Sequence, residues 1–359
     1  MLGWRLKEFS HPYNSISSAK AIMLLDQYFH TLLPIIEAEL VSAVAQANGP
    51  GLSELHSMLS YAMGWEGPGA GPETRGKRIR PLLVLLTTAA AGGEWRVSLP
   101  AAAAVELIHN FSLIHDDIED QSTHRRGRPT IWKQWSIAHA TNAGDALFAL
   151  AHLELLRLAE TLPYPRVIQA ARLLNQTSLH LTQGQYLDLA YEQQLDLTEA
   201  DYWPMIAGKT SALLAACTEL GAIGACATDE TRQAYRQFGV SLGLAFQVQD
   251  DTLGIWGDSA LTGKSTDSDL VTGKKTLPVL YGLSKKRAFY QRWLRGAISP
   301  SEAPSIANLL AEEGAKEFCL HQVERLTNQA LAAFTTAQPQ GEAAAALVDL
   351  ANLLLHRKS

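Results

Sequence analysis

The sequence has little cysteine and no excess of basic charge, and each shortage excludes a class of protein. Its 359 residues include only 3 cysteines, Cys217, Cys226 and Cys319, and these form no CxxC pair. Neither a disulfide framework nor a zinc site is expected, and the cysteines are predicted to be small buried residues in a reducing compartment. The net charge of −6 gives no sign of the basic face that nucleic-acid binding usually needs.

Targeting segments and long hydrophobic runs are also lacking. The N-terminal stretch MLGWRLKEFSHPYNS does not have the basic-then-apolar order of a secretory signal. The most apolar stretch, residues 99–114, contains Glu106, His109 and Asn110 and is too short and too polar to span a bilayer. We therefore expect a cytoplasmic protein with no transmembrane segment.

Helical periodicity dominates what is present. Apolar residues recur at i, i+3, i+4 and i+7 in segments at residues 21–47, 100–120, 142–160, 166–192, 201–226, 230–255 and 341–357. No run alternates with period two for long enough to predict a strand, and the glycine- and proline-rich breaks are short. The pattern predicts a single all-α domain over residues 1–359, with roughly ten or more helices. Segments 143–156 and 211–217 are apolar nearly all round, which indicates burial either as a central helix or at a dimer interface.

A crowded acidic cluster ends one of the apolar segments. It comprises Asp116, Asp117, Glu119 and Asp120. At 3.6 residues per turn, Asp116 and Asp120 lie on nearly the same helix face, and His109 and Ser112 continue the stripe. A solvated acidic helix end is the alternative interpretation. However, the helix dipole disfavours negative charge at this end, and the stripe runs into a segment too apolar to face water.

A second acidic cluster, Asp250 and Asp251, ends another apolar segment, and Asp258 follows beyond Gly254. Opposed carboxylates repel one another unless a cation lies between them. Oxygen ligands without cysteine or histidine nearby favour a hard cation, Mg²⁺ first, and the spacing of a calcium EF-hand loop is missing. Mg²⁺ held by few carboxylates completes its shell with water and substrate phosphate. The two clusters therefore point to a diphosphate substrate.

Basic residues accompany these acidic ends. They are Lys77, Arg78, Arg80, Arg125, Arg126, Arg128, Lys209, Lys264, Lys274 and Lys275. Any one of them could be an ordinary solvated charge, but several lie beside the aspartates, and arginine forks match phosphate geometry. Two Gly-Lys stretches, at residues 203–210 and 257–265, have the wrong spacing for a nucleotide P-loop and follow no predicted strand.

Five blocks of the sequence stand in a recognisable order. They are GKRIRP at 76–81, the first aspartate-rich region at 106–130, GKTS at 208–211, the second aspartate-rich region at 246–258 and a lysine segment at 262–278. Together they resemble the trans-isoprenyl diphosphate synthases, the polyprenyl synthetase family. The resemblance implies a helical bundle of the isoprenoid synthase type with a central substrate cavity. It also implies head-to-tail condensation of isopentenyl diphosphate with dimethylallyl, geranyl or farnesyl diphosphate to a short all-trans prenyl diphosphate.

The resemblance also implies roles for individual residues. The implied metal ligands, for about three Mg²⁺ ions with bound diphosphate, are Asp116, Asp117, Asp120, Asp250 and Asp251. The residues implied to hold isopentenyl diphosphate are Lys77, Arg80, His109 and Arg126. Those implied for the allylic diphosphate are Arg125, Lys209 and Lys264, and Lys274 belongs to the same lysine segment. Thr210 and Gln247 would lie beside the nascent allylic cation, and Gln185 and Asp188 resemble a further block near the site.

Two further features of the sequence concern the length of the prenyl product and one departure from the family pattern. In the family, the residues four and five before the first aspartate shape the pocket floor. Here they are Ser112 and Phe111, a pair that resembles enzymes making geranylgeranyl diphosphate, with farnesyl diphosphate as the alternative. Gly254 stands where the second region would carry its last aspartate, and Asp258 is a candidate replacement. A class I terpene cyclase and a non-catalytic partner subunit are the rival interpretations, and the resemblance implies a homodimer.

Overall fold

The computed structural model describes residues 18–194, 196–257 and 269–355. The α-helices are α1 Ser18–Ala45, α2 Ser53–Ala62, α3 Pro72–Arg75, α4 Ile79–Ala90, α5 Leu99–Glu119, α6 Ile131–Gln134, α7 Ile137–Leu156, α8 Tyr164–Gln193, α9 Glu199–Ile206, α10 Ala212–Gly224, α11 Asp229–Trp256, α13 Asp269–Thr272, α14 Leu277–Lys285, α15 Ala288–Trp293, α16 Ala303–Glu312, α17 Ala315–Thr336 and α18 Gly341–Leu355. Two 3-10 helices, η1 Trp95–Ser98 and η2 Arg157–Glu160, and a π-helix, η3 Ala207–Ser211, complete them. The strands of this part of the chain are β1 His124–Arg125 and β2 Arg128–Pro129, which pair antiparallel. The prediction of an all-α fold is confirmed.

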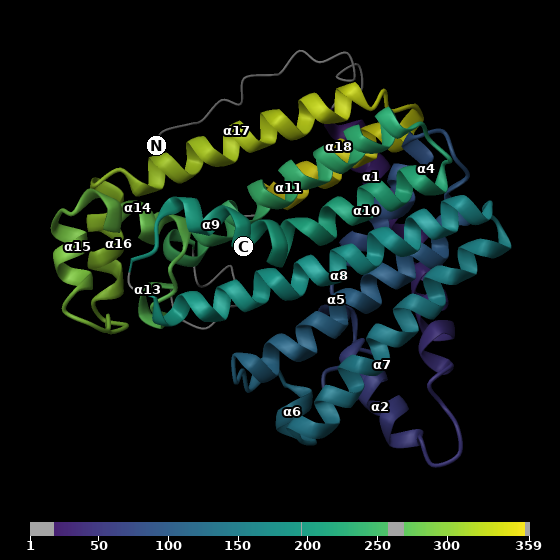
Figure 1. The fold of residues 1–359 in the computed structure, drawn as a ribbon, viewed down its shortest axis with the longest axis horizontal. Helices are drawn as coiled ribbons and strands as arrows, with labels where there is room; N and C mark the ends of the chain where they lie inside the picture. Colours follow the sequence, from purple (N-terminus) through teal and green to yellow (C-terminus); the bar gives the residue numbers. More distant parts are fainter. Residues whose placement is uncertain (1–17, 195, 258–268, 356–359) are drawn as a thin grey trace.

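The long helices α17, α11, α10, α8, α5 and α7 form the main body of the bundle, and α13 to α16 form a smaller group at one end (Figure 1). The smaller group has its own apolar core around Phe289 and Leu310. In the main body, α5 packs on α7, α10 on α11, and α11 on α17. The helices that end in the two aspartate-rich regions, α5 and α11, are thus both anchored in the main body.

Helices α4 and α10 form the centre of the bundle. Residues 82–86 of α4 are completely buried, and every residue from 213 to 224 in α10 is buried. Helix α10 packs on α4, α8 and α11. Each leucine buried in this way contributes about 1.5–3 kcal/mol relative to an exposed one. The apolar segment 211–217 therefore belongs to a central helix, one of the two predicted alternatives.

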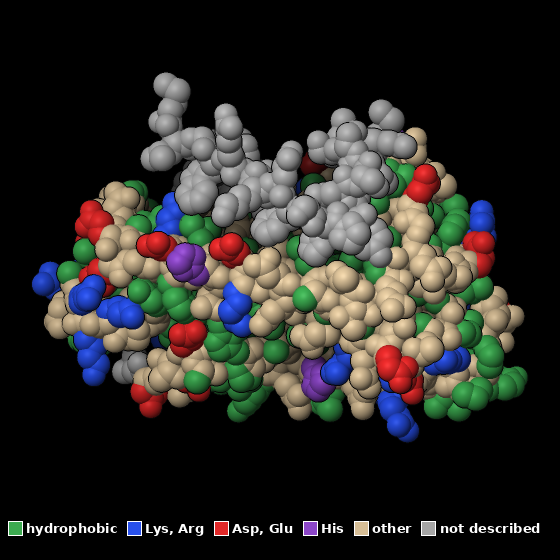
Figure 2. Space-filling view, turned by 90° about the horizontal axis from the view of Figure 1, so that it is seen from above, with side chains coloured by type: hydrophobic (Ala, Val, Ile, Leu, Met, Phe, Trp, Pro, Cys, Tyr) green, Lys and Arg blue, Asp and Glu red, His purple; other side chains and the backbone are tan. Residues whose placement is uncertain are grey.

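Two stretches of the described residues, Leu24–Ala45 and Trp95–Glu119, are long and apolar enough to cross a membrane by length and composition alone. Core helices of globular proteins pass the same test. The second stretch is 67% buried inside the protein and ends in the acidic cluster, as a core helix of this bundle would. Over the face shown in Figure 2, basic and acidic side chains are interspersed.

The prediction of buried cysteines holds for two of the three. Cys217 and Cys319 are buried, whereas Cys226 is exposed. The prediction is wrong at Cys226 because the apolar pattern continues to that residue while α10 already ends at Gly224. There the chain turns out of the helix, with a φ of 52° at Cys226.

Candidate active site

The C-terminal end of α5 carries the first aspartate-rich cluster. Asp120 caps the helix, and its backbone N–H donates to the carbonyl oxygen of Asp116 at 2.8 Å. Burial, with added repulsion from Asp120, raises the pKa of Asp116 from 3.8 to about 6, although Lys209 opposes the shift. Because a cation relieves repulsion of this kind, Asp116 and Asp120 suit a bound divalent metal.

Asp117 differs from its neighbours because an arginine already holds it. The side chain is buried, and its two oxygens accept hydrogen bonds from Nε of Arg125 at 2.9 Å each. Nη2 of Arg125 lies 2.8 Å from Oδ1 of the same carboxylate. A paired fork of this kind fixes an arginine in one geometry. Asp117 therefore fixes the position of Arg125 next to Asp116 and Asp120.

A partly buried basic cluster surrounds His109. The guanidinium groups that act on this imidazole belong to Arg80, Arg126, Arg125 and Arg78. Burial and these four charges lower the pKa of His109 well below its ordinary value. Within the described residues, Nε of Arg80 is buried and has no hydrogen-bond partner. A buried donor without a partner costs free energy, so the cluster suits an anion with several oxygen acceptors, such as a diphosphate.

Two arginines of these blocks stabilise the fold instead. Arg78 is buried and its guanidinium lies 2.7 Å from Glu37 and 2.8 Å from Glu106. Arg128 stacks over the ring of Tyr61, with 3.8 Å between its Cζ and the ring centroid. Both side chains are committed to protein partners, which agrees with their omission from the predicted site.

The predicted lysines lie in different surroundings. Lys77 and Lys274 are exposed. Nζ of Lys275 donates to two carbonyl oxygens in the last turn of α8, at 2.7 and 2.8 Å, and so caps that helix. Lys264 and Asp258 lie outside the described residues.

The π-helix η3 presents Lys209 and Thr210 to the site. Its backbone lies so close to α8 that a Cβ on Gly184 would be 2.0 Å from the amide nitrogen of Lys209. A Cβ on Gly208 would be 2.9 Å from the Cα of Gly184. Nζ of Lys209 lies 2.5 Å from Oδ2 of Asp188 on α8. The two glycines therefore allow the close backbone contact that places Lys209, and π-bulges often occur at such functional positions.

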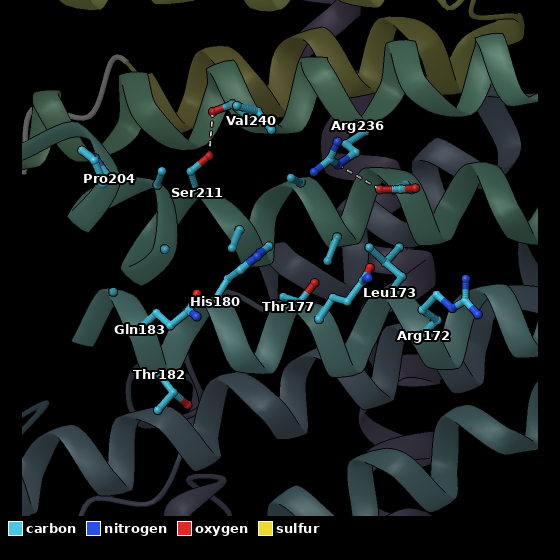
Figure 3. A pocket seen from close by; sticks show the side chains of 18 of the residues that line it. Arg172, Leu173, Thr177, His180, Thr182, Gln183, Pro204, Ser211, Arg236 and Val240 are labelled. Atoms are coloured by element: carbon cyan, nitrogen blue, oxygen red, sulfur yellow. Dashed lines mark hydrogen bonds and ion pairs between the residues drawn. The ribbon is translucent and has the colours of Figure 1, made fainter. Parts of the chain in front are cut away.

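Helix α8 contacts the end of α5 on one side and borders a groove on the other. On one, Nε2 of Gln185 donates to Oε2 of Glu119 at 2.8 Å and ties α8 to the end of α5. On the other, a groove of about 1150 Å³ runs beside η3, α10 and α11, and Thr177 and His180 point into it (Figure 3). None of the residues predicted for the site lines this groove. The groove and the candidate site are therefore separate features of the described chain.

The end of α11 carries the second cluster, in which Asp251 is the hub of a hydrogen-bond network. Its oxygens accept from the hydroxyl of Tyr202 at 2.6 Å, from Nε2 of Gln247 at 2.8 Å and from the backbone N–H of Leu277 at 3.3 Å. The hydroxyl of Thr210 donates to Oε1 of Gln247 at 2.6 Å. Burial raises the pKa of Asp251 to about 7 despite these donors. The network joins α9, η3, α11 and α14 around one carboxylate.

Asp269, which the sequence interpretation missed, lies where the family pattern would place an aspartate of α11. A Cβ on Gly254 would be 2.2 Å from Oδ2 of Asp269. Asp269 is also close enough to Asp251 to contribute to its raised pKa. The first residue of α13 thus places a carboxylate directly beside Gly254. Asp269 is visible in the sequence of the lysine segment, but the closeness of Asp269 to Gly254 depends on tertiary structure.

The residues predicted to form the pocket floor lie one to two turns before the aspartates of α5. The ring centroid of Phe111 lies 5.1 Å from that of Phe148 on α7 and 4.7 Å from that of His115. The hydroxyl of Ser112 donates to the carbonyl oxygen of His109 at 2.9 Å, so this small side chain folds back on its own helix. Phe111 and Phe148 therefore join α5 and α7 through an aromatic contact.

The donor set suits Mg²⁺ that is shared with a substrate. In the described part of the chain, no three His, Cys, Asp or Glu side chains already converge on one point. Mg²⁺ is commonly held by one or two carboxylates together with water and substrate phosphate. Carboxylates on α5 and α11, accompanied by Lys209 and the arginines, fit that arrangement.

Comparison with known proteins gives a consistent result. A family model described as polyprenyl synthetase matches residues 71–310. The chain is 37% identical over 315 residues to (2E,6E)-farnesyl diphosphate synthase of Mycobacterium tuberculosis, a match that covers 85% of this chain and 87% of the relative. It is 38% identical over 315 residues to geranylgeranyl diphosphate synthase of the same species, with the same coverage. The crystal structure of a polyprenyl synthetase from Streptomyces coelicolor A3(2) superposes with a TM-score of 0.82 at 33% identity, covering 93% of this chain and 99% of that one.

Proposed function

The chain belongs to the polyprenyl synthetase family, and on this premise we propose that it condenses isopentenyl diphosphate with an allylic diphosphate in an Mg²⁺-dependent reaction. It is a trans-prenyltransferase, and the short-chain type is the one its named relatives support. One observation carries the proposal: Asp116 and Asp120 lie close enough to Lys209 to interact with its charge, and the basic cluster lies around His109. Residues 1–359 would act as one domain.

Four carboxylates would hold the metal. They are Asp116 and Asp120 at the end of α5, Asp250 at the end of α11, and Asp269 at the start of α13. When bound there with diphosphate, Mg²⁺ stabilises the negative charge of the leaving group.

Asp117 and Asp251, which the sequence placed among the metal ligands, would support the site without binding metal. Asp117 holds Arg125, and Asp251 accepts hydrogen bonds from Tyr202 and Gln247. Their oxygens are engaged by protein donors that any metal bond would have to displace.

The two diphosphates would bind on different sides of the carboxylates. Arg125 and Lys209 would hold the allylic diphosphate, together with Lys264 and Lys274 of the lysine segment. Lys77, Arg80, His109 and Arg126 would hold the isopentenyl diphosphate. Guanidinium forks suit phosphate oxygens in two-point contacts. Holding both substrates in line turns their reaction into an intramolecular event.

The remaining site residues would act on the reacting carbons. Loss of the diphosphate leaves an allylic cation, and the oxygen dipoles of Thr210 and Gln247 would stabilise it. The double bond of isopentenyl diphosphate attacks this cation, and a proton is then lost to the released diphosphate. The apolar helices behind the carboxylates would exclude water, which would otherwise quench the cation.

Geranylgeranyl diphosphate is the product that we propose, with farnesyl diphosphate as the alternative, and Phe111 would form the floor of the chain pocket. Phe111→Ala should lengthen the product by at least one isoprene unit, because it removes the ring that packs on Phe148. The products of the wild type and the variant, after removal of diphosphate, can be sized by chromatography. Products of equal length would contradict this floor assignment.

We also propose that the enzyme is a cytoplasmic homodimer. Exposed apolar side chains gather on two neighbouring helices, Leu153 and Leu156 on α7 and Ile168, Leu179 and Tyr186 on α8. Large apolar patches of this kind usually mark an interaction surface.

The test of the proposed function is an assay of the purified chain with Mg²⁺, isopentenyl diphosphate and each allylic primer in turn. We expect prenyl diphosphate products that disappear when a chelator removes Mg²⁺ and return when the ion is restored. A terpene cyclase would instead consume the allylic diphosphate without isopentenyl diphosphate. A non-catalytic partner subunit would give no product from any primer, and this result would overturn the proposal.

A further inference from the structure

A chain of three hydrogen bonds runs from α9 through α11 to η3. It begins at the hydroxyl of Tyr202, which is only 1% exposed and donates to Oδ2 of Asp251 at 2.6 Å. Oδ1 of Asp251 accepts from Nε2 of Gln247 at 2.8 Å, and Oε1 of Gln247 accepts from Thr210 at 2.6 Å. We propose that Tyr202 is a positioning residue of the reaction, which acts through Asp251 to fix the orientation of Gln247 and Thr210. The inference rests on the proposed function, in which those two residues face the reacting carbons.

The chemistry of the groups allows the chain one direction only. In its ionised form the carboxylate of Asp251 accepts hydrogen bonds and donates none, whereas a side-chain amide has one donating and one accepting end. Asp251 therefore holds the NH₂ end of Gln247, which leaves the carbonyl end directed at Thr210. The threonine hydroxyl must in turn donate to that carbonyl. The orientation of both site residues is thus set by the position of the carboxylate of Asp251.

Tyr202 fixes that position. Its hydroxyl is the closest of the three donors to Asp251, and the backbone N–H of Leu277 contacts the same oxygen only at 3.3 Å. Without the hydroxyl, the carboxylate is free to turn about its Cβ–Cγ bond toward the remaining donors. Gln247 then loses the fixed partner that determines which end of its amide faces Thr210. Hydrogen bonds linked in a chain also strengthen one another, so the loss extends to the last bond.

Tyr202→Phe removes the hydroxyl and keeps the ring. We expect kcat to fall about tenfold, a change of about 1.4 kcal/mol in the barrier, while KM for each diphosphate stays within about twofold. The decisive measurement is a double-mutant cycle with Gln247→Ala. If Tyr202 acts through Gln247, the Tyr202→Phe change has no further effect on kcat in the Gln247→Ala background. A role in folding alone would give additive losses.

Control variants distinguish a failure of the proposed function from a failure of the inference about Tyr202. Tyr235→Phe removes another fully buried tyrosine hydroxyl, twelve residues before Gln247 on α11, and should leave kcat unchanged. An inactive wild type would overturn the proposed function, whereas an active wild type with unchanged kcat in Tyr202→Phe would overturn this inference alone. Additive losses in the cycle would overturn it as well. Should Tyr202→Phe fail to fold, Asp251→Asn provides the same cycle, because an amide at this position no longer dictates the orientation of Gln247.

Discussion

Gly254 and Asp269 are the pair of residues that tests the proposed metal site at the end of α11. Because Oδ2 of Asp269 occupies the space beside Gly254, the carboxylate there comes from α13 and not from α11. Asp269→Ala should weaken the apparent affinity for Mg²⁺ by about 10–100-fold, the usual range for residues that support a metal. Titration of activity with Mg²⁺ and direct measurement of Mg²⁺ binding in the presence of diphosphate would both show the change.

The reverse change at Gly254 tests the same pair more sharply. Gly254→Asp restores the family's aspartate but drives it into Asp269, so we expect weaker Mg²⁺ binding and no gain in activity. The double variant Gly254→Asp with Asp269→Ala removes the collision and should bind Mg²⁺ more tightly than Asp269→Ala alone. A double variant no better than Asp269→Ala would show that the two positions are not equivalent.

At the scale of the element, the π-helix η3 depends on two glycines that let it contact α8. Gly208→Ala places a Cβ 2.6 Å from the carbonyl oxygen of His180 and 2.9 Å from the Cα of Gly184, both backbone atoms. The helices must then separate, and Lys209 and Thr210 move with η3. We expect kcat/KM to fall by about 100-fold, as a misplacement of about 1 Å can cost. Steady-state kinetics on a variant shown by thermal unfolding to be folded is the measurement.

Gly49→Ala is the matched control for this change. A Cβ at Gly49 meets only a leucine side chain at 3.6 Å, an ordinary contact, so this variant should keep wild-type kinetics. Near-normal kinetics in Gly208→Ala as well would mean that the contact between η3 and α8 does not position Lys209.

The elements differ in how far the sequence predicts them. Long amphipathic helices such as α5 and α11 follow from the spacing of their apolar residues, because burial of one face stabilises them. A π-turn leaves no such pattern: the segment AGKTS of η3 lies in a continuous apolar repeat, and only the contact with α8 reveals it. Charge clusters along the chain predict the residues of the candidate site. The hydrogen bonds that distinguish Asp116 from Asp117 and Asp251 depend on partners far away in sequence, such as Tyr202, so spacing alone could not separate their roles.

At the scale of the whole molecule, the exposed apolar face of α7 and α8 predicts self-association. Tyr164, Ile168, Leu179 and Tyr186 of α8 are all exposed and fall within about 60° of one another around the helix axis. A stripe of this kind gains free energy when a second copy covers it. Two charges introduced into it would have to be buried without partners, which costs several kcal/mol. The double variant Ile168→Glu with Leu179→Glu should therefore weaken the dimer by at least about 100-fold.

Analytical ultracentrifugation over a range of concentrations would measure this change. Leu294→Glu, at an exposed leucine just after α15, is the control and should sediment as the wild type does. A wild type that stays monomeric at every concentration, or a double variant that sediments as a dimer like the wild type, would rule out this face as the interface. Product length and kcat measured on the monomeric variant would then show whether each subunit's site works alone. Because the carboxylates and basic residues of the proposed site come from elements of one chain, we expect a folded monomer to retain activity.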